Sequence, residues 1–492
     1  MRHASLVVVS TLSTLLLACG SDSTPSPQPP TPEPAPPSVS PGPGPVPTVP
    51  QASLRLLHAS ANAPMVDVWI KGETQPLLKN ATFGAATGYV NVPAGKVELE
   101  LRASPSRSTD AVAFTSPAID LAAGTKTTAI AAGQLDATDK SQAFRILPMV
   151  DGFKTAPDKI TVRVVNGAPD APALGLDIGD DNAAKPEIPA TARFAESGAD
   201  GVQITADRPL QIGVIAGGAR ITAFTTPTLP LGSELYVVAT GFVARHPRAN
   251  DGFSLLTVSA TASYGLARQN PVIYSLHTAP DVPVVDLFAG EVELADNLGF
   301  GQLSAPIQVR PGRYDVDFFP HANGNVRPQG APVASRSSSI LVAGQRYLAV
   351  ATGFIAGAAP SFELSAYSDE KAYDDAANAR LRAVHAAPDA PTVDIGVATS
   401  GGLSPVLIPA LAFLGSSPSV GLSVAPGSYT LGVTPAGQSA SIVARFPVTL
   451  NAGARSFAIA AGVLDATKGP AFRLLAIDTA VNPWTIASVA PL

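Results

Sequence analysis

The stretch LRLLHASANAPMVDVWI, residues 54–70, recurs three more times in this chain of 492 residues. The related phrases are VRVVNGAPDAPALGLDI at 162–178, IYSLHTAPDVPVVDLFA at 273–289 and LRAVHAAPDAPTVDIGV at 381–397. Their starts lie 108, 111 and 108 residues apart, as the numbering shows. A repeat of this length is a whole small domain and not a short solenoid repeat. The sequence therefore predicts a string of four modules.

Each unit alternates apolar and polar residues with a period of two, as in Val97 to Leu101 and again in Tyr314 to Phe318. Such alternation is typical of a strand with one face on a core and the other in water. Glycines nine residues apart bracket a further apolar strand in every unit, for example Gly124 and Gly133, and we expect them in turns that need positive φ. About seven strands per unit and no convincing helix favour an all-β fold of four tandem antiparallel, immunoglobulin-like β-sandwiches. A small barrel is the alternative architecture.

The first residues form a targeting segment in which an apolar stretch, too short to span a bilayer, follows Arg2 and His3. It ends in Leu16-Leu17-Ala18-Cys19, which resembles the lipobox of bacterial lipoproteins. That resemblance implies cleavage before Cys19, the only cysteine in the sequence, and attachment of acyl chains to it. Acyl chains at one terminus would anchor the protein to a membrane. We therefore expect a lipid-anchored protein of the cell envelope. The absence of an acidic residue directly after Cys19 favours the outer membrane. Both the periplasmic side and the surface-exposed side of that membrane are left open.

Thirteen of the 26 residues from Pro25 to Pro50 are proline, which predicts a disordered, extended stalk. The resulting domain prediction is a signal peptide at 1–18, the lipidated cysteine and stalk at 19–52, sandwiches at 53–150, 161–260, 272–367 and 380–478, and a tail at 479–492. A net charge of −6 without a basic cluster argues against nucleic acid as a partner.

A histidine stands nine residues before an aspartate in three of the four phrases: His58 and Asp67, His277 and Asp286, His385 and Asp394. The second unit has Asn166 and Gly175 at these places. One histidine and one carboxylate per module are too few ligands for a tight zinc site. We interpret the pairs as loop caps that bond to backbone groups, with a metal or acid–base pair as the functional alternative.

The phrase HAxPDxPxVD, the Pro-Ala-Gly type of turn and the strand of the Ala-Ile-Ala-Ala-Gly type occur in the same order in the units. On these motifs the chain resembles tandem copies of the domain-of-unknown-function family 4397, from Ser53 to the region of Thr479. The resemblance implies a β-sandwich module without an established activity.

No catalytic, phosphate-binding or dinucleotide-binding motif is found. We therefore expect a non-enzymatic envelope lipoprotein with a structural, spacer or adhesion role, without cofactor or metal. Its lipid would contact the membrane, and a surface glycan or protein is the partner class left open. The alternatives are a surface lipoprotein that binds glycan, peptidoglycan or peptide, and a hydrolase that uses the His and Asp pairs.

Overall fold

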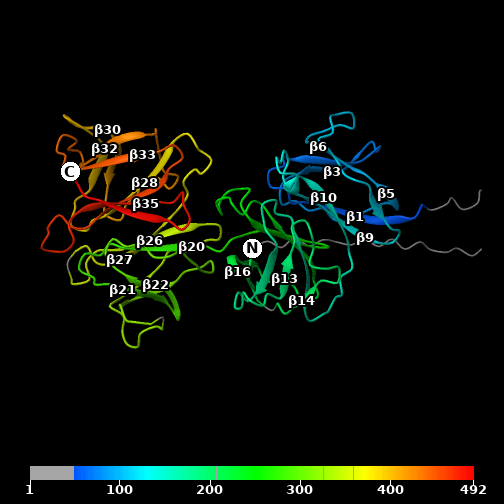
Figure 1. The fold of residues 1–492 in the computed structure, drawn as a ribbon, viewed down its shortest axis with the longest axis horizontal. Helices are drawn as coiled ribbons and strands as arrows, with labels where there is room; N and C mark the ends of the chain where they lie inside the picture. The colour runs from blue at the N-terminus through cyan, green and yellow to red at the C-terminus, as the bar shows by residue number, and fades with distance from the viewer. Residues whose placement is uncertain (1–48, 207, 325, 358) are drawn as a thin grey trace, which may run out of the picture. The chain divides into compact units, whose positions relative to one another are not determined.

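The structure is a computed structural model that describes residues 49–492 except positions 207, 325 and 358. The expected signal peptide, Cys19 and most of the expected stalk lie outside these residues. Strands make up the ordered elements in Figure 1, apart from one short 3-10 turn, η1 (Lys140–Gln142). Within the described part of the chain, no helix is both long and apolar enough to cross a bilayer.

Unit 1 contains two four-stranded sheets, in the orders β10-β9-β1-β4 and β3-β2-β6-β7, and the small pair β5-β8. Apolar side chains from both large sheets form one core, which includes Leu54, Val68 and Leu101. Its strands are β1 (Gln51–His58), β2 (Val66–Ile70), β3 (Pro76–Ala81), β4 (Val90–Pro93), β5 (Gly95–Val97), β6 (Leu99–Ala103), β7 (Phe114–Thr115), β8 (Ile119–Leu121), β9 (Lys126–Ala132) and β10 (Arg145–Val150).

Unit 2 has the sheets β14-β11-β17-β18-β19 and β13-β12-β15-β16 around a core of its own. Its strands are β11 (Ile160–Asn166), β12 (Leu174–Ile178), β13 (Ile188–Thr191), β14 (Val202–Ile204), β15 (Gln211–Ala216), β16 (Ala219–Thr225), β17 (Glu234–Thr240), β18 (Ser254–Ser259) and β19 (Ser263–Arg268).

Unit 3 has the sheets β23-β20-β26-β27 and β22-β21-β24-β25, again around one core. Its strands are β20 (Val272–His277), β21 (Val285–Ala289), β22 (Val292–Leu298), β23 (Ile307–Gln308), β24 (Asp315–Pro320), β25 (Ala334–Ser337), β26 (Arg346–Thr352) and β27 (Glu363–Ser368).

Unit 4 has the sheets β31-β28-β34-β35-β36 and β30-β29-β32-β33. Its strands are β28 (Ala379–Ala386), β29 (Val393–Thr399), β30 (Gly402–Leu411), β31 (Leu422–Val424), β32 (Gly427–Pro435), β33 (Ala444–Leu450), β34 (Arg455–Ala461), β35 (Arg473–Asp478) and β36 (Thr485–Val489). The prediction of an all-β chain of tandem sandwiches is confirmed.

The first strand of every unit lies parallel to a later strand, in the pairs β1 with β9, β11 with β17, β20 with β26 and β28 with β34. The remaining neighbours within the two large sheets of each unit run antiparallel. The glycines that close the later strands, such as Gly133 and Gly353, have positive φ as expected. A Cβ there would collide with a backbone carbonyl of the next loop, so no other residue fits the turn.

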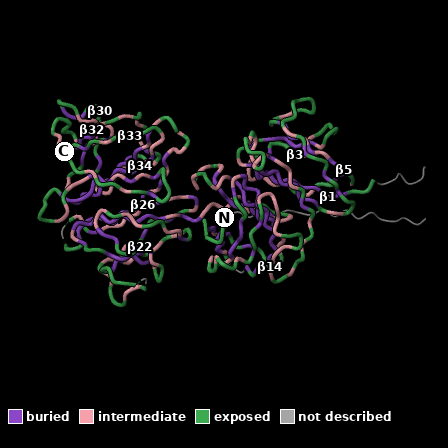
Figure 2. Tube along the Cα trace, viewed as in Figure 1, coloured by how far each residue is buried: buried purple, intermediate pink, exposed green. Residues whose placement is uncertain are grey.

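The units are joined in two pairs through the outer faces of the sheets that contain these parallel strands. In β9, Ala129 and Ala131 point into the core of unit 1, whereas Ile130 and Ala132 pack against unit 2. The same alternation places Tyr274 and Leu276 of β20 against unit 4. In Figure 1, β20 and β26 lie beside β28 and β35, and Figure 2 shows buried residues along these strands. A strand that is apolar on both faces is thus buried on both faces.

The even-numbered units carry one strand more in this sheet, β19 and β36. Residues 479–492 were expected to be a tail, but they include β36, which pairs antiparallel with β35. Trp484 stands directly before this strand, is 5% exposed and stacks on Tyr274 with 4.1 Å between ring centroids. The segment is ordered because it covers the seam between units 3 and 4, a contact that the repeat pattern does not reveal.

Candidate functional site

The three repeated histidines lie at the C-terminal ends of the first strands of their units, with buried rings. Each Nε2 faces a proline carbonyl six residues later, in the loop that leads to the second strand. The distances are 3.4 Å from His58 to Pro64, 3.1 Å from His277 to Pro283 and 3.1 Å from His385 to Pro391. Each ring therefore donates to a backbone carbonyl of the loop that follows its own strand.

Unit 2 makes the same connection without a histidine. Nδ2 of Asn166 donates to the carbonyl of Pro172 at 2.8 Å, again six residues later, and to that of Thr191 at 3.1 Å. Because an amide can replace the imidazole, the loop needs a hydrogen-bond donor here and not a proton-transfer group.

The repeated aspartates of units 1, 3 and 4 hold a different pair of backbone groups, an arrangement we call the aspartate clamp. One oxygen accepts the N–H of a residue with positive φ in the neighbouring strand, and the other accepts an N–H beyond the opposite strand. The donors are Asn80 and Ser106 for Asp67, Asn297 and Ala322 for Asp286, and Ala410 and Gly437 for Asp394. The clamp stabilises a strained bulge residue, which fits a role in folding.

The structure thus gives each histidine and its aspartate separate partners, and no hydrogen bond or ion pair joins the two within units 1, 3 and 4 as described. Burial lowers the pKa of the three histidines below its usual value, more than the bonds to the loop raise it. Burial alone would raise the pKa of Asp67, but bonds from Ser104, Asn80 and Ser106 outweigh it and lower the pKa. Neutral imidazoles, and ionised carboxylates in the clamps of Asp67 and Asp286, both suit bonding to the backbone.

The aspartates of the Pro-Asp dipeptides in units 2, 3 and 4 make hydrogen bonds that reach far along the chain. Asp170, Asp281 and Asp389 accept two backbone N–H groups from the loop 73 to 76 residues later. In unit 1, Asn62 exchanges two hydrogen bonds with Leu135 at the corresponding place. The only signal for this contact in the sequence is the nearly constant spacing between the Pro-Asp dipeptide and the glycine that closes the later parallel strand.

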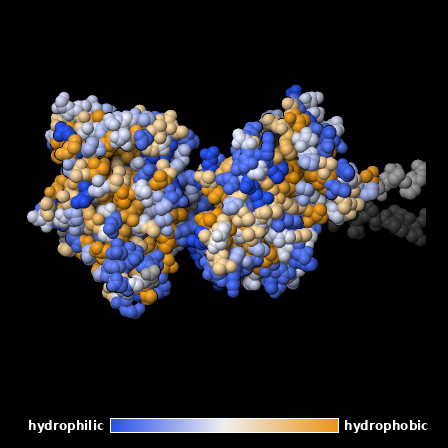
Figure 3. Space-filling model, viewed as in Figure 1, coloured by the Kyte–Doolittle hydropathy of each residue, from blue (hydrophilic) through white to orange (hydrophobic). Residues whose placement is uncertain are grey.

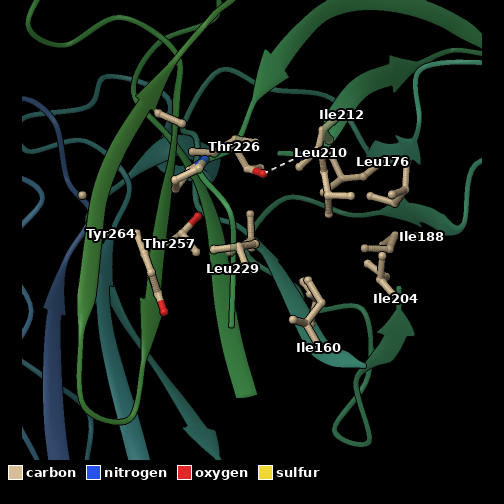
Figure 4. Close-up of a pocket in the computed structure, with 17 residues that line it drawn as sticks. Ile160, Leu176, Ile188, Ile204, Leu210, Ile212, Thr226, Leu229, Thr257 and Tyr264 are labelled. Atoms are coloured by element: carbon tan, nitrogen blue, oxygen red, sulfur yellow. Dashed lines mark hydrogen bonds between the residues drawn. The ribbon is translucent and has the colours of Figure 1, made fainter. Parts of the chain in front are cut away.

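The cavities inside the sandwiches of units 2 and 3 are small. The one shown in Figure 4 lies between the sheets of unit 2 and is lined by Ile160, Leu176 and Ile188, among others. Its volume of about 30 Å³ has room for little more than a water molecule, so it is a packing space and not a ligand site. A larger apolar cavity of about 230 Å³ lies beside His385 in unit 4.

A polar groove of about 640 Å³ lies where the loop after β17 meets units 3 and 4. It is lined by guanidinium groups, amides, hydroxyls and aromatic rings, including Arg346, Gln308 and Tyr373. His246 from unit 2 stacks on Tyr373 with 4.2 Å between ring centroids. The volume and the mixed lining are of the kind that binds small polar ligands.

The two tryptophans do not provide exposed rings on which a sugar could stack. Trp69 is 3% exposed and lies beneath the guanidinium of Arg102, and Trp484 is buried in the seam between units 3 and 4. On the face drawn in Figure 3, apolar residues lie in several clusters among polar ones.

Comparison with protein families finds the domain of unknown function DUF4397 at residues 52–177 and 272–396, which together are just over half of the chain. The chain belongs to this family. Each match begins at the first strand of an odd-numbered unit and ends in the second strand of the following unit, β12 or β29. No curated protein matches the chain.

Proposed function

We propose that this member of the DUF4397 family is a non-enzymatic lipoprotein of the cell envelope. Four copies of the family domain would serve as a structural, spacer or adhesion element, attached to the outer membrane through acyl chains on Cys19. The repeated His, Asn and Asp side chains support a structural role, because each of them bonds to backbone groups of its own unit.

The observation that carries the proposal is the joining of the units into pairs. Each pair buries an additional apolar face, formed by residues such as Ile130 and Val238 in the first pair and Leu348 and Ile459 in the second. Such faces stabilise by roughly 25 cal/mol per Å² of apolar surface removed from water. They would turn separate sandwiches into stiffer double modules, as a spacer requires.

A deletion series on the full-length protein tests this role. Removing units 3 and 4 together should leave a folded, protease-resistant first pair whose reach from the membrane is shorter. Removing unit 4 alone exposes Tyr274 and Leu348, so protease sensitivity or aggregation should follow. Equal behaviour of the two deletions would contradict the double-module spacer.

The lipid anchor is tested separately by labelling cells with radioactive palmitate. The wild-type protein should carry the label and sediment with membranes, and the Cys19→Ser variant should do neither. Label on the Cys19→Ser variant, or an unlabelled wild-type protein, would contradict the anchor.

The groove beside Arg346 and Tyr373 favours a second candidate function, binding of a glycan, peptidoglycan fragment or peptide. Binding of peptidoglycan fragments and glycans to the full-length protein should then fall when Ile221→Trp fills the groove. Val292→Trp is the matched control, because Val292 is also exposed but does not line the groove. Equal binding by the two variants would exclude the groove.

A further inference from the structure

The aspartate clamp of unit 3 has additional partners. Nδ1 of His321 lies 2.8 Å from Oδ1 of Asp286 and 3.4 Å from Oδ1 of Asp296. One ligand atom from each of these three side chains lies within 4.8 Å of the other two. A nitrogen and two carboxylate oxygens at this spacing can share one metal ion.

The fold brings the three residues together from three neighbouring strands. Asp286 is in β21, which pairs with β22 on one side and β24 on the other. Asp296 lies in β22 next to the bulge, and His321 follows the last residue of β24. Asp286 and Asp296 therefore stand on paired strands, and the backbone N–H of His321 donates to the carbonyl of Val284 at 3.0 Å, which holds the first loop residue against the sheet.

Neither His321 nor Asp296 is needed for the clamp, as the other units show. By strand register, their places are taken by Ser104 and Lys79 in unit 1. In unit 4 they are taken by Ala436 and Pro409. These units build the same clamp without a second carboxylate or a second histidine, so the additional groups of unit 3 call for another explanation.

Glu293, also in β22, adds a further carboxylate close to the cluster. The residue is half-buried, and its Oε1 has no hydrogen-bond partner among the described residues. Burial raises the pKa of Glu293, and the charges of Asp296 and Asp286 raise it further. An unpartnered carboxylate oxygen near two other carboxylates is a place where a cation would relieve repulsion.

We propose that unit 3 binds one divalent transition-metal ion, with Zn²⁺ preferred, through Nδ1 of His321 and one oxygen each of Asp286 and Asp296. The ion takes the place of the proton that otherwise lies between His321 and Asp286. Imidazole with carboxylates suits zinc and its neighbours, whereas Ca²⁺ prefers six to eight oxygen ligands. The side chains of His321 and Asp296 are 29% and 53% exposed, so an ion can enter and water can complete its coordination.

Calorimetric titration of the tag-free, chelator-treated full-length protein with ZnCl₂ tests the proposal. We expect saturable binding of a single equivalent of Zn²⁺, and weaker binding of CaCl₂ by at least about tenfold. The absence of saturable zinc binding, or an equal affinity for Ca²⁺, would overturn the site.

Two substitutions assign the ligands. His321→Ser installs the residue of unit 1 and should abolish the binding event, and Asp296→Asn should weaken it by about tenfold or more. Thermal unfolding of both metal-free variants should match the wild type, because the clamp bonds to Asn297 and Ala322 remain. Wild-type zinc affinity in His321→Ser would overturn the assignment.

A transplant provides the matched positive control. Lys79→Asp with Ser104→His rebuilds the same ligands around Asp67 in unit 1, and the stoichiometry should rise from one to two equivalents. When His321→Ser is added to the transplanted protein, one equivalent of zinc should remain, which assigns the new site to unit 1. An unchanged stoichiometry on transplantation would show that these three residues do not suffice, and would overturn the site as proposed.

Discussion

The two pairs of units use an aspartate at the same place in very different surroundings. Asp151 follows the last strand of unit 1, and Asp369 follows the last strand of unit 3. The backbone N–H of each donates to the carbonyl of the residue that begins the later parallel strand, Lys126 of β9 or Arg346 of β26. The carboxylate of Asp151 accepts hydrogen bonds from the hydroxyl groups of Tyr89, Thr128 and Tyr236. Asp369 instead lies among cations.

The centre of the cationic cluster is closed off from solvent, whereas Arg346 reaches its edge with 12% of its side chain exposed. Nζ of Lys371 lies 2.6 Å from Asp369, a guanidinium nitrogen of Arg346 lies 2.8 Å away, and both Asp369 and Lys371 have no exposed side-chain surface. Burial would raise the pKa of Asp369, but Lys371, His246 and Arg346 hold it well below its usual range. Burial lowers the pKa of Lys371 to about 8.

The comparison teaches that pairing requires an acceptor at this place but not a charged donor. Hydroxyl groups satisfy Asp151 at little desolvation cost, whereas the ions around Asp369 depend on one another. The two seams should therefore respond differently to the same substitution.

The largest expected effect is that of Asp369→Ala compared with Asp151→Ala. The former leaves Lys371 buried without its counter-charge and should lower the free energy of unfolding by about 3–5 kcal/mol. The latter removes an acceptor from neutral donors and should cost about 1–3 kcal/mol. Denaturant unfolding, with hydrogen exchange in β26 and β9 to separate the pairs, measures both.

Asp369→Ala with Lys371→Met is the control, because it removes both charges and should recover most of the loss. Equal costs of the two alanine variants would remove the distinction between the seams.

A smaller effect, equal in the two pairs, is expected for Thr240→Val and Thr352→Val. The hydroxyl of Thr240 donates to the carbonyl of Ala59 across the first seam, and that of Thr352 donates to Ala386 across the second. Each substitution leaves a buried carbonyl without this donor and should cost about 1–2 kcal/mol in chemical unfolding. Thr449→Val, at an exposed position of β33, is the control and should be neutral. A large difference between Thr240 and Thr352 would show that the seams are not equivalent in this bond.

The smallest effect near neutral pH is expected for His58→Asn, His277→Asn and His385→Asn combined, which gives every unit the donor of unit 2. Because folding lowers the pKa of these histidines, the unfolded chain binds protons more readily as the pH falls below about 6.5. The wild type should therefore lose stability between about pH 6.5 and 5, and the triple variant should lose less. Thermal melts over this interval test the difference. If the stability of the two proteins falls equally with pH, the folded protein does not hold the three imidazoles uncharged as expected.

Much of the fold could be predicted from local pattern. Alternation of apolar and polar residues identifies strands, and the positive-φ glycines identify their ends, because both depend on residues close in sequence. The histidine loops are local too, with partners six residues apart. The reach of Asp281 to Ile355, 74 residues later, could not be predicted, because nothing in a spacing tells which loop lies opposite.

By itself, the sequence determined a chain of four β-sandwich units, since each carries its own strands, turns and core residues. The tertiary structure decided that the units join in pairs, that Trp484 covers a seam, and that His321 meets Asp286 instead of His277. These contacts depend on register and on the face a strand turns toward its neighbour. A shift of one residue reverses that face, and no pattern within one strand records what packs against it.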